Sequence, residues 1–284
     1  MAYLDHIRLC NAWDPAGFRP FLVAGARVGW VRHAFADRLA GFSDIVGVDE
    51  GGVELLPRFA DFATRTDAMA GMIAALVAEG AIPPLRREHY PVLPRWGAEP
   101  LLSLDRAAVN FFGTVAYGIH VNGFVRRPDG ALEMWIGTRA RDRGIAPGKL
   151  DNMIAGGQPI GLSLSENLIK EAGEEADIGS ALALTARPAG TVTYRMETPQ
   201  GVKVDCLFVY DLELPLDVIP RNTDGEVESF ALLPWQTVAD IVRDSDDFKF
   251  NCPLVVLDFL IRHGLIPPEH PDYLALAAGL RAWG

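Results

Sequence analysis

One stretch of the sequence, SLSENLIKEAGEEA at residues 163–176, restricts the fold strongly because it specifies an amphipathic helix with a defined start. Ser163 followed by Glu166 fits a capping box, in which the serine accepts a backbone hydrogen bond of the first turn and the glutamate reaches back to the cap. The apolar positions repeat with the helical period and form one stripe: Leu164, Leu168, Ile169, Ala172 and Ala176. We therefore predict a helix over residues 164–176.

Three glutamates crowd the end of this helix. Glu171, Glu174 and Glu175 share one edge of the apolar stripe, because spacings of three and four residues share a face. Like charges at this spacing repel each other, and the last turn of a helix favours cations. A solvated acidic face is the ordinary explanation of such a cluster. A bound Mg²⁺, which takes carboxylate oxygens, would instead convert the repulsion into coordination.

The sequence pattern changes around residues 89–106, where three prolines and a glycine interrupt the segments with helical or strand periodicity. Upstream, residues 64–82 follow an amphipathic helical pattern, and residues 44–57 fit two strands joined by a Glu-Gly-Gly turn. We expect an N-terminal α/β module in this part of the chain.

Strand patterns dominate downstream. Residues 110–127 and 131–140 flank Pro128-Asp129-Gly130, whose proline and glycine favour a tight turn, so a hairpin is expected. Two further strands are predicted at residues 190–197 and 202–214, and residues 248–264 fit a buried helix. The pattern predicts a second α/β unit.

The formal charge of −11 argues against a nucleic-acid polymer as partner, because such binding depends on Lys and Arg. A small phosphorylated metabolite stays compatible, since a few local cations can reverse the field in one cleft. No apolar run approaches the roughly 18 residues of a membrane span, and the start MAYLDHIRLCNAW lacks the features of a signal peptide. We predict a cytoplasmic protein without membrane contact, in which Cys10, Cys206 and Cys252 are buried or free thiols.

The acidic helix and the loop before it resemble the Nudix box, whose pattern is a glycine, a glutamate, and then Arg-Glu-apolar-x-Glu-Glu-x-Gly-apolar. The chain offers Gly156-Gly157 and the run KEAGEEADI at residues 170–178. It departs from the pattern where Lys170 replaces the arginine, Asp177 the last glycine and Leu162 the first glutamate. Lysine lacks the bidentate fork of arginine, so the positioning of Glu171 stays open. Because Leu162 replaces the first glutamate, the number of bound metals also stays open.

Three segments in order, at residues 150–176, 221–230 and 248–264, resemble one Nudix subfamily in particular. Its catalytic module is also found fused to thiamine pyrophosphokinase, and it carries an N-terminal domain of unassigned function. The resemblance implies a Nudix fold, with a mixed β-sheet between helices and a C-terminal helix, over residues 109–284. A smaller accessory α/β domain is expected over residues 1–108.

The resemblance also implies an activity, which is the Mg²⁺-dependent hydrolysis of a diphosphate linkage, with Mn²⁺ as an alternative ion. The implied substrate is thiamine diphosphate, or a damaged or oxidised analogue, cleaved to the monophosphate and phosphate. ADP-ribose or another nucleoside diphosphate derivative is the first alternative, and a Nudix domain that binds a ligand without turnover is the second. A homodimer and the role of the N-terminal domain stay open.

By the same resemblance, Glu171, Glu174 and Glu175 are the metal ligands and catalytic groups. A glutamate from a later loop can act as the base, and Glu226 or Glu228 would supply it; an acidic surface turn is the alternative. We expect the cations that bind the substrate phosphates, and the loop that contacts these phosphates, to lie near the box. The candidates for substrate binding are Arg139, Lys149, Asn152, Gly156, Gly157 and Lys249.

Several other side chains have less specific expectations. His120 alternates with apolar neighbours and is expected to be a half-buried strand residue rather than a catalyst. Trp135, Phe248 and Phe250 are expected in the core, with a place in the substrate pocket as the alternative.

Overall fold

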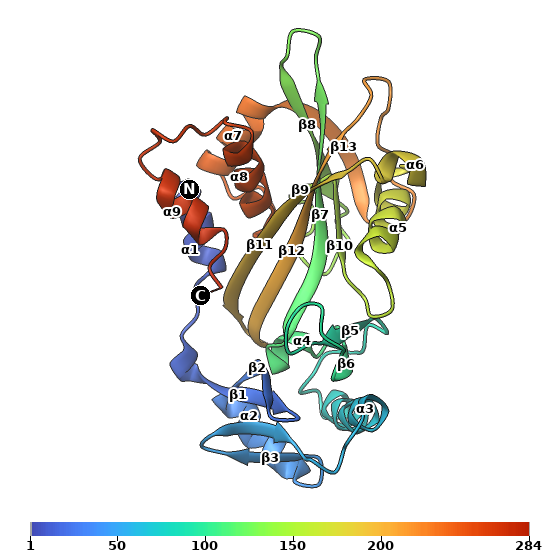
Figure 1. Cartoon of the computed structure of the whole chain (residues 1–284), viewed down its shortest axis with the longest axis vertical. Helices are drawn as coiled ribbons and strands as arrows, with labels where there is room; N and C mark the ends of the chain where they lie inside the picture. The colour runs from blue at the N-terminus through green and yellow to red at the C-terminus, as the bar shows by residue number, and fades with distance from the viewer. Residues whose placement is uncertain (1, 284) are drawn as a thin grey trace.

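A seven-stranded mixed sheet forms the centre of the molecule (Figure 1). The computed structural model describes residues 2–283. Five strands follow one another across the sheet in the order β11 (Arg187–Thr198), β12 (Gly201–Glu213), β7 (Val115–Arg126), β8 (Leu132–Arg139) and β13 (Val227–Pro234). Two short strands complete it, with β10 (Ile154–Gly157) pairing to β7 and β9 (Leu150–Asn152) pairing to β8. Only the β12–β7 pair is parallel among the pairings of this sheet in the described chain, so the predicted mixed sheet is confirmed.

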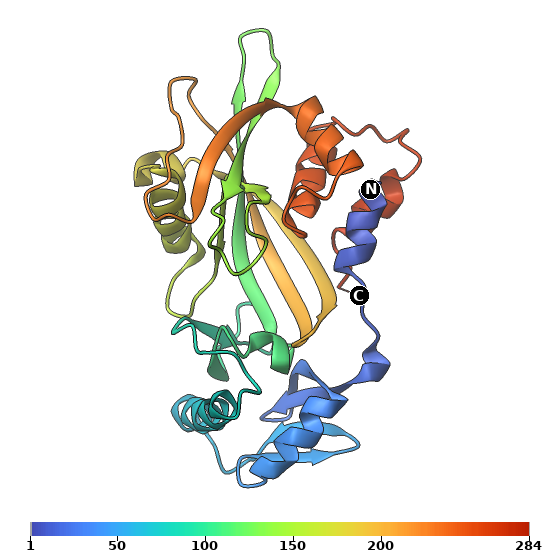
Figure 2. The same cartoon turned by 180° about the vertical axis from the view of Figure 1, so that it is seen from behind.

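Helices lie in two groups on opposite sides of this sheet (Figures 1 and 2). On one side are α5 (Leu164–Ala176) and α6 (Ser180–Ala183). On the other are α7 (Trp235–Asp244) and α8 (Cys252–Arg262), and α8 is buried along almost its whole length. Burial on all sides explains why the sequence of α8 is apolar all round rather than on one stripe.

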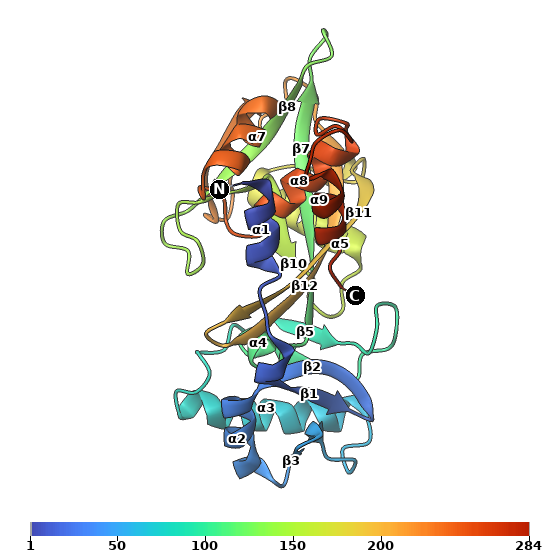
Figure 3. The same cartoon turned by 90° about the vertical axis from the view of Figure 1, so that its left-hand side faces the viewer.

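A second, four-stranded sheet lies at the other end of the molecule, with the order β2-β1-β4-β3 (Figure 3). Its elements are β1 (Phe18–Val23), β2 (Ala26–Arg32), β3 (Val46–Asp49), β4 (Gly52–Leu55), α2 (His33–Leu39), α3 (Phe62–Ala78) and the 3₁₀ turns Pro15–Gly17 and Ala40–Phe42. The predicted strand pair at residues 44–57 and the predicted helix at residues 64–82 correspond to β3–β4 and α3.

The Pro-rich stretch at residues 89–106 is more ordered than its composition indicated. It contains a small hairpin of β5 (His89–Val92) and β6 (Leu102–Asp105), followed by the short helix α4 (Val109–Phe112). Figure 1 places this hairpin between the four-stranded sheet and the central sheet. It therefore connects the two parts of the molecule structurally as well as covalently.

The first helix, α1 (Tyr3–Cys10), does not pack on the four-stranded sheet that follows it in the chain. It lies beside α8 and α9 (Tyr273–Gly279), as Figure 3 shows, and Tyr3, Ile7 and Cys10 share a core with these helices. The start of the expected accessory unit at residues 1–108 thus contributes to the core beneath the central sheet.

Within residues 2–283, no helix combines the length and apolar character needed to cross a membrane.

Candidate active site

The acidic helix α5 begins and ends as its sequence predicted. Ser163 is the N-cap: its N–H donates to Glu166 Oε2 at 2.8 Å, and its Oγ accepts from the Glu166 N–H at 3.2 Å. Asp177 follows the last turn with φ +56°, in the left-handed region where glycine is at least cost. The aspartate that replaces the last glycine of the Nudix pattern therefore occupies a position whose backbone favours glycine.

The three box glutamates differ in their surroundings. Glu175 is 8% exposed, and its Oε2 accepts the Ala155 N–H of β10 at 2.8 Å. The side chain of Glu171 is 14% exposed and lies against Gly156, where a Cβ would stand 2.3 Å from its Cδ. Glu174 is 49% exposed on the outer side of the helix. Burial raises the pKa of Glu175 well above its usual value, and the charges of Glu171, Asp151 and Glu226 add to the rise.

Lys170 joins two of these carboxylates. Its Nζ lies 3.0 Å from Glu171 Oε1 and 2.7 Å from Glu174 Oε2. The single ammonium of Lys170 thus offsets the repulsion between Glu171 and Glu174. It does so as a point charge, without the two parallel hydrogen bonds that an arginine could donate to one carboxylate. Glu175 takes no part in this pair, because it points to the backbone of β10.

The oxygens of the three glutamates fit a hard divalent cation by their chemistry, since Mg²⁺ and Mn²⁺ favour carboxylate ligands. Ligand atoms of all three do not lie within 4.8 Å of one another in the described chain. Glu171 and Glu174 are held together by a cation, Lys170, and Glu175 is a buried carboxylate one turn away from Glu171. The assignment of these groups as metal ligands stays a prediction.

The loop before β13 lies against the end of α5. The hydroxyl of Thr223 donates to the carbonyl of Glu174 at 2.6 Å, which fixes the loop to the last turn of the helix. Glu226 Oε2 pairs with Arg143 at 2.7 Å, and Glu228 pairs more loosely with Arg141 at 3.5 Å. Of the two candidate bases, Glu226 is the one whose charge influences the pKa values of both Glu171 and Glu175.

The cations expected to bind phosphates are mostly engaged with acids. Arg139 donates from Nη1 to Asp151 Oδ2 at 2.7 Å, and Lys249 Nζ lies 3.2 Å from the same oxygen. Lys149 binds Asp246, donating to its carbonyl at 2.6 Å. Of these three, Lys249 also lines a cleft of about 460 Å³.

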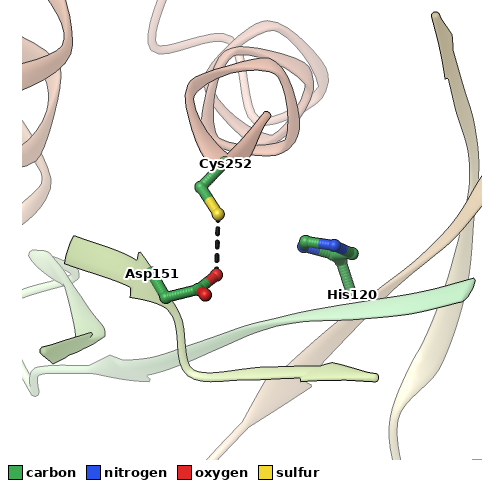
Figure 4. A group of neighbouring side chains, drawn as sticks. All are labelled: His120, Asp151 and Cys252. Carbon is green, nitrogen blue, oxygen red and sulfur yellow. Dashed lines mark hydrogen bonds between the residues drawn. The ribbon is translucent and has the colours of Figure 1, made fainter. Parts of the chain in front are cut away.

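Asp151 is the centre of a buried polar cluster that the sequence did not single out. The thiol of Cys252 donates to its Oδ1 at 2.6 Å, and His120 lies beside them (Figure 4). Burial alone would raise the pKa of Asp151, but Lys249 and the other donors outweigh it and hold the pKa at about 2. The carboxylate is therefore an anion that neutralises buried cations.

His120 is fully buried, not half-buried as its strand pattern indicated. Its Nδ1 donates to Asn152 Oδ1 at 2.8 Å, so Asn152 holds the imidazole rather than facing an open loop. Trp135 and Phe248 lie in the cores on the two sides of the sheet, whereas Phe250 packs against a core and also lines the cleft.

The titration of His120 gives a testable pH dependence. Burial and the charge of Lys249 lower its pKa to about 4, against the raising influence of Asp151 and Asp205. Because the unfolded chain binds this proton already below about pH 6.5, the free energy of unfolding falls as pH drops from about 6.5 to 4, by about 3 kcal/mol. Urea titrations across this range should show the slope, and His120→Asn, which keeps a donor for Asn152, should reduce it.

Part of the slope should survive in that variant, because burial also lowers the pKa of His6. An identical slope in the variant and the parent protein would contradict the assignment of the proton to His120.

A cleft of about 460 Å³ opens beside the box glycines. Its walls come from the central sheet, from the loop between β8 and β9, from the loop between α7 and α8, and from the region around the β5–β6 hairpin. Its lining includes Arg86, Tyr90, Arg106, His120, Gly156, Gly157 and Lys249. Gly156 separates the cleft from the side chain of Glu171, since this residue lines the cleft and a Cβ added to it would meet that carboxylate.

Gly156→Ala should therefore disturb the site without unfolding the chain. The added methyl would stand 2.3 Å from Glu171 Cδ, and a flexible glutamate can move away. A shift of about 1 Å in a catalytic group can cost about 100-fold in rate, so we expect such a loss in kcat with a melting temperature near that of the parent. Gly173→Ala on α5 is the matched control, since its methyl would meet nothing within 4 Å; it should gain about 1 kcal/mol and keep its activity. Equal rates for the two variants would contradict the role given to Gly156.

Relatives with curated names match almost the entire chain. Nudix hydrolase 24 of Arabidopsis thaliana, named chloroplastic, is 44% identical over 98% of this chain and 77% of its own length. Nudix hydrolase 20 of the same plant, also named chloroplastic, is 41% identical over 98% of this chain and 77% of its own length. Among solved structures, the protein DR0079 of Deinococcus radiodurans is 19% identical, with a TM-score of 0.43 over 60% of this chain and 97% of that chain.

The chain belongs to the Nudix hydrolase family. It is an enzyme of the kind that cleaves diphosphate linkages, and enzymes of this family generally use divalent cations. Residues 2–116 also match a family described as a domain of unknown function, DUF4743. These residues overlap the segment 1–108 that was expected to be an accessory domain, and the function of the matched family is not described.

Proposed function

We propose that this enzyme hydrolyses thiamine diphosphate, or an oxidised or otherwise damaged analogue, to the monophosphate and phosphate with Mg²⁺. The substrate class rests on the resemblance of residues 150–176, 221–230 and 248–264 to the subfamily whose module is fused to thiamine pyrophosphokinase. The observation that supports the site is the contact of Glu171 with Gly156, which brings a box carboxylate to the border of a cleft of about 460 Å³. That volume is in the range of pockets for small ligands.

Glu171, Glu174 and Glu175 would hold the Mg²⁺, with Mn²⁺ as the alternative ion. When bound, the cation neutralises charge on the diphosphate and acidifies a water molecule. Gly156 and Gly157 line the cleft and would border the phosphates, while Glu171 and Tyr90 fill the space where side chains at these two positions would stand. Lys249, which faces the cleft beside Asp151, adds positive charge near the substrate.

Glu226 is the proposed base. Arg143 holds its Oε2, which leaves Oε1 to accept a proton from the attacking water. The water oxygen bonds to the terminal phosphorus, the bridging P–O bond breaks, and the monophosphate leaves with the bridging oxygen. Arg139, Lys149 and Asn152 would act by holding Asp151, Asp246 and His120 in place rather than by touching the substrate.

Two other predictions accompany this proposal. We keep the division into an accessory unit over residues 1–108 and a Nudix unit over residues 109–284, with α1 packed against the latter. A cytoplasmic location also stays a prediction, while the Arabidopsis relatives are named chloroplastic.

The test is a substrate panel with product identification. Thiamine diphosphate, its oxidised analogues, ADP-ribose and nucleotide sugars are incubated with the enzyme, with and without Mg²⁺. Metal-dependent release of inorganic phosphate from the thiamine compounds would support the proposal. Two organic phosphates released from ADP-ribose alone would move the substrate to the nucleoside diphosphate alternative, and tight Mg²⁺ binding without turnover would favour the non-catalytic one.

A further inference from the structure

We propose that the segment around the β5–β6 hairpin forms one wall of the active-site cleft and that its Arg106 and Arg86 bind the phosphate groups of the substrate. This assigns a role to part of the DUF4743 region, residues 2–116. The inference rests on the proposed function in one respect, namely that the cleft beside Gly156 and Gly157 is the site of hydrolysis.

The hairpin is seated directly on the box loop. Tyr90 of β5 places its hydroxyl against Gly157, so closely that a Cβ on this glycine would stand 1.7 Å from it. The Ile160 N–H donates to the carbonyl of His89 at 2.9 Å. Any side chain at position 157 would push Tyr90 away, so the second box glycine makes room for the hairpin.

The loop of the hairpin also packs against the central sheet through Trp96. The ring of Trp96 lies 4.6 Å, centroid to centroid, from Tyr117 of β7 and also 4.6 Å from Phe208 of β12. Aromatic pairs at this distance stabilise a contact beyond the area they bury. With Tyr90 and Trp96 both anchored, the hairpin is a fixed wall rather than a mobile flap.

Asp105 sets the positions of both arginines. It is buried, and its Oδ1 accepts the N–H groups of Arg86 at 3.0 Å and Ala107 at 2.9 Å. Its Oδ2 accepts the Arg87 N–H at 2.8 Å. One carboxylate therefore ties together the two backbone segments that carry Arg86 and Arg106, which pre-organises their side chains toward the cleft that both of them line.

The two guanidinium groups are more available than the cations predicted near the box. No carboxylate lies within 4.0 Å of the Arg86 guanidinium in residues 2–283, and it reaches the loop at Gly144. Arg106 lies over the ring of Tyr90, and its Nη1 pairs with Glu88 at 2.8 Å, which leaves other N–H groups of the fork free. Arg139, by contrast, forms an ion pair with the buried Asp151.

Arginine suits this task because its planar fork matches two phosphate oxygens at once. A diphosphate in the cleft would meet Arg106 and Arg86 on the hairpin wall, and Gly156, which lies against Glu171, on another wall. The site as a whole then needs both parts of the chain, although each box residue comes from the Nudix part.

The experiment uses the full chain with Arg106→Gln, Arg86→Gln and Arg106→Lys. Loss of a charge-assisted hydrogen bond costs about 1.5–3 kcal/mol, so Arg106→Gln should weaken the binding of inorganic pyrophosphate with Mg²⁺, measured by calorimetry, about 10- to 100-fold. KM for the substrate should rise by a similar factor with a smaller change in kcat. Arg106→Lys should fall between parent and glutamine variant.

Arg38→Gln is the matched control, because Arg38 also forms an exposed pair with a glutamate, at 3.0 Å from Glu79, but does not line the cleft. It should leave the pyrophosphate affinity and KM unchanged. Pyrophosphate affinity equal to that of the parent in both Arg106→Gln and Arg86→Gln would overturn the inference. Because this readout needs no turnover, it is decided even if the thiamine compounds are not substrates.

Discussion

Glu175→Gln is expected to lower kcat by about 1,000-fold while the metal-free protein keeps or slightly raises its melting temperature. A metal ligand that contributes about 4 kcal/mol of transition-state stabilisation accounts for a factor of this size. The amide keeps the shape of the side chain, and its oxygen can still accept the Ala155 N–H. Removing a buried charge next to Glu171 relieves an unfavourable interaction, which is why folding should not suffer.

The measurement is turnover at saturating Mg²⁺, paired with thermal unfolding in a chelator. Glu79→Gln, an exposed glutamate paired with Arg38, serves as the control and should change neither quantity appreciably. Turnover within a factor of about three of the parent would remove Glu175 from the site.

Asp151→Asn should be the most destabilising single change among the residues discussed, by about 3–5 kcal/mol. Breaking a buried ion pair by removing one partner leaves uncompensated charge, here on Arg139 and Lys249, and takes the acceptor from the Cys252 thiol. At about 2–4 °C per kcal/mol, the melting temperature should fall by roughly 10 °C.

The matched control is Asp246→Asn, an exposed partner of Lys149, for which the free energy of unfolding should change by about 0.5 kcal/mol or less.

The pH dependence of the free energy of unfolding offers a second check. The depressed pKa of Asp151, about 2, means that its carboxylate stabilises the fold above its unfolded pKa of about 3.8. The difference between parent and Asp151→Asn should hold from pH 8 to about 4 and shrink toward pH 2. Similar losses for the two variants would contradict this account of the cluster.

Local sequence patterns predicted much of the fold, because they act within a few residues. Ser163 and Glu166 marked the start of α5, and Pro128-Asp129-Gly130 marked the turn between β7 and β8. The apolar run of α8 indicated burial. These signals concern capping, turn geometry and periodicity, all of which are readable without knowing the partners of a residue.

The environment of the site could not be predicted in the same way, because it depends on contacts between distant residues. The sequence predicted Arg139 as a phosphate ligand, but in the structure its guanidinium pairs with Asp151. No sequence pattern marked Asp151 itself, although it is the neighbour of the candidate Asn152. Arg106 is the last residue of the Pro-rich stretch at residues 89–106, which indicated only a boundary, and Arg86 precedes that stretch. Tyr90 and Gly157 are 67 residues apart, so no local sequence pattern could predict their contact.

We propose that α5 carries the catalytic cation beside the cleft that the β5–β6 hairpin also lines. It is tested most directly by anomalous scattering from crystals grown with Mn²⁺ and pyrophosphate. We expect Mn²⁺ on carboxylates of Glu171, Glu174 and Glu175, with pyrophosphate in the cleft beside Arg106. Mn²⁺ bound instead within the buried group of His120, Asp151 and Cys252, whose ligand atoms lie within 4.8 Å of one another, would contradict it.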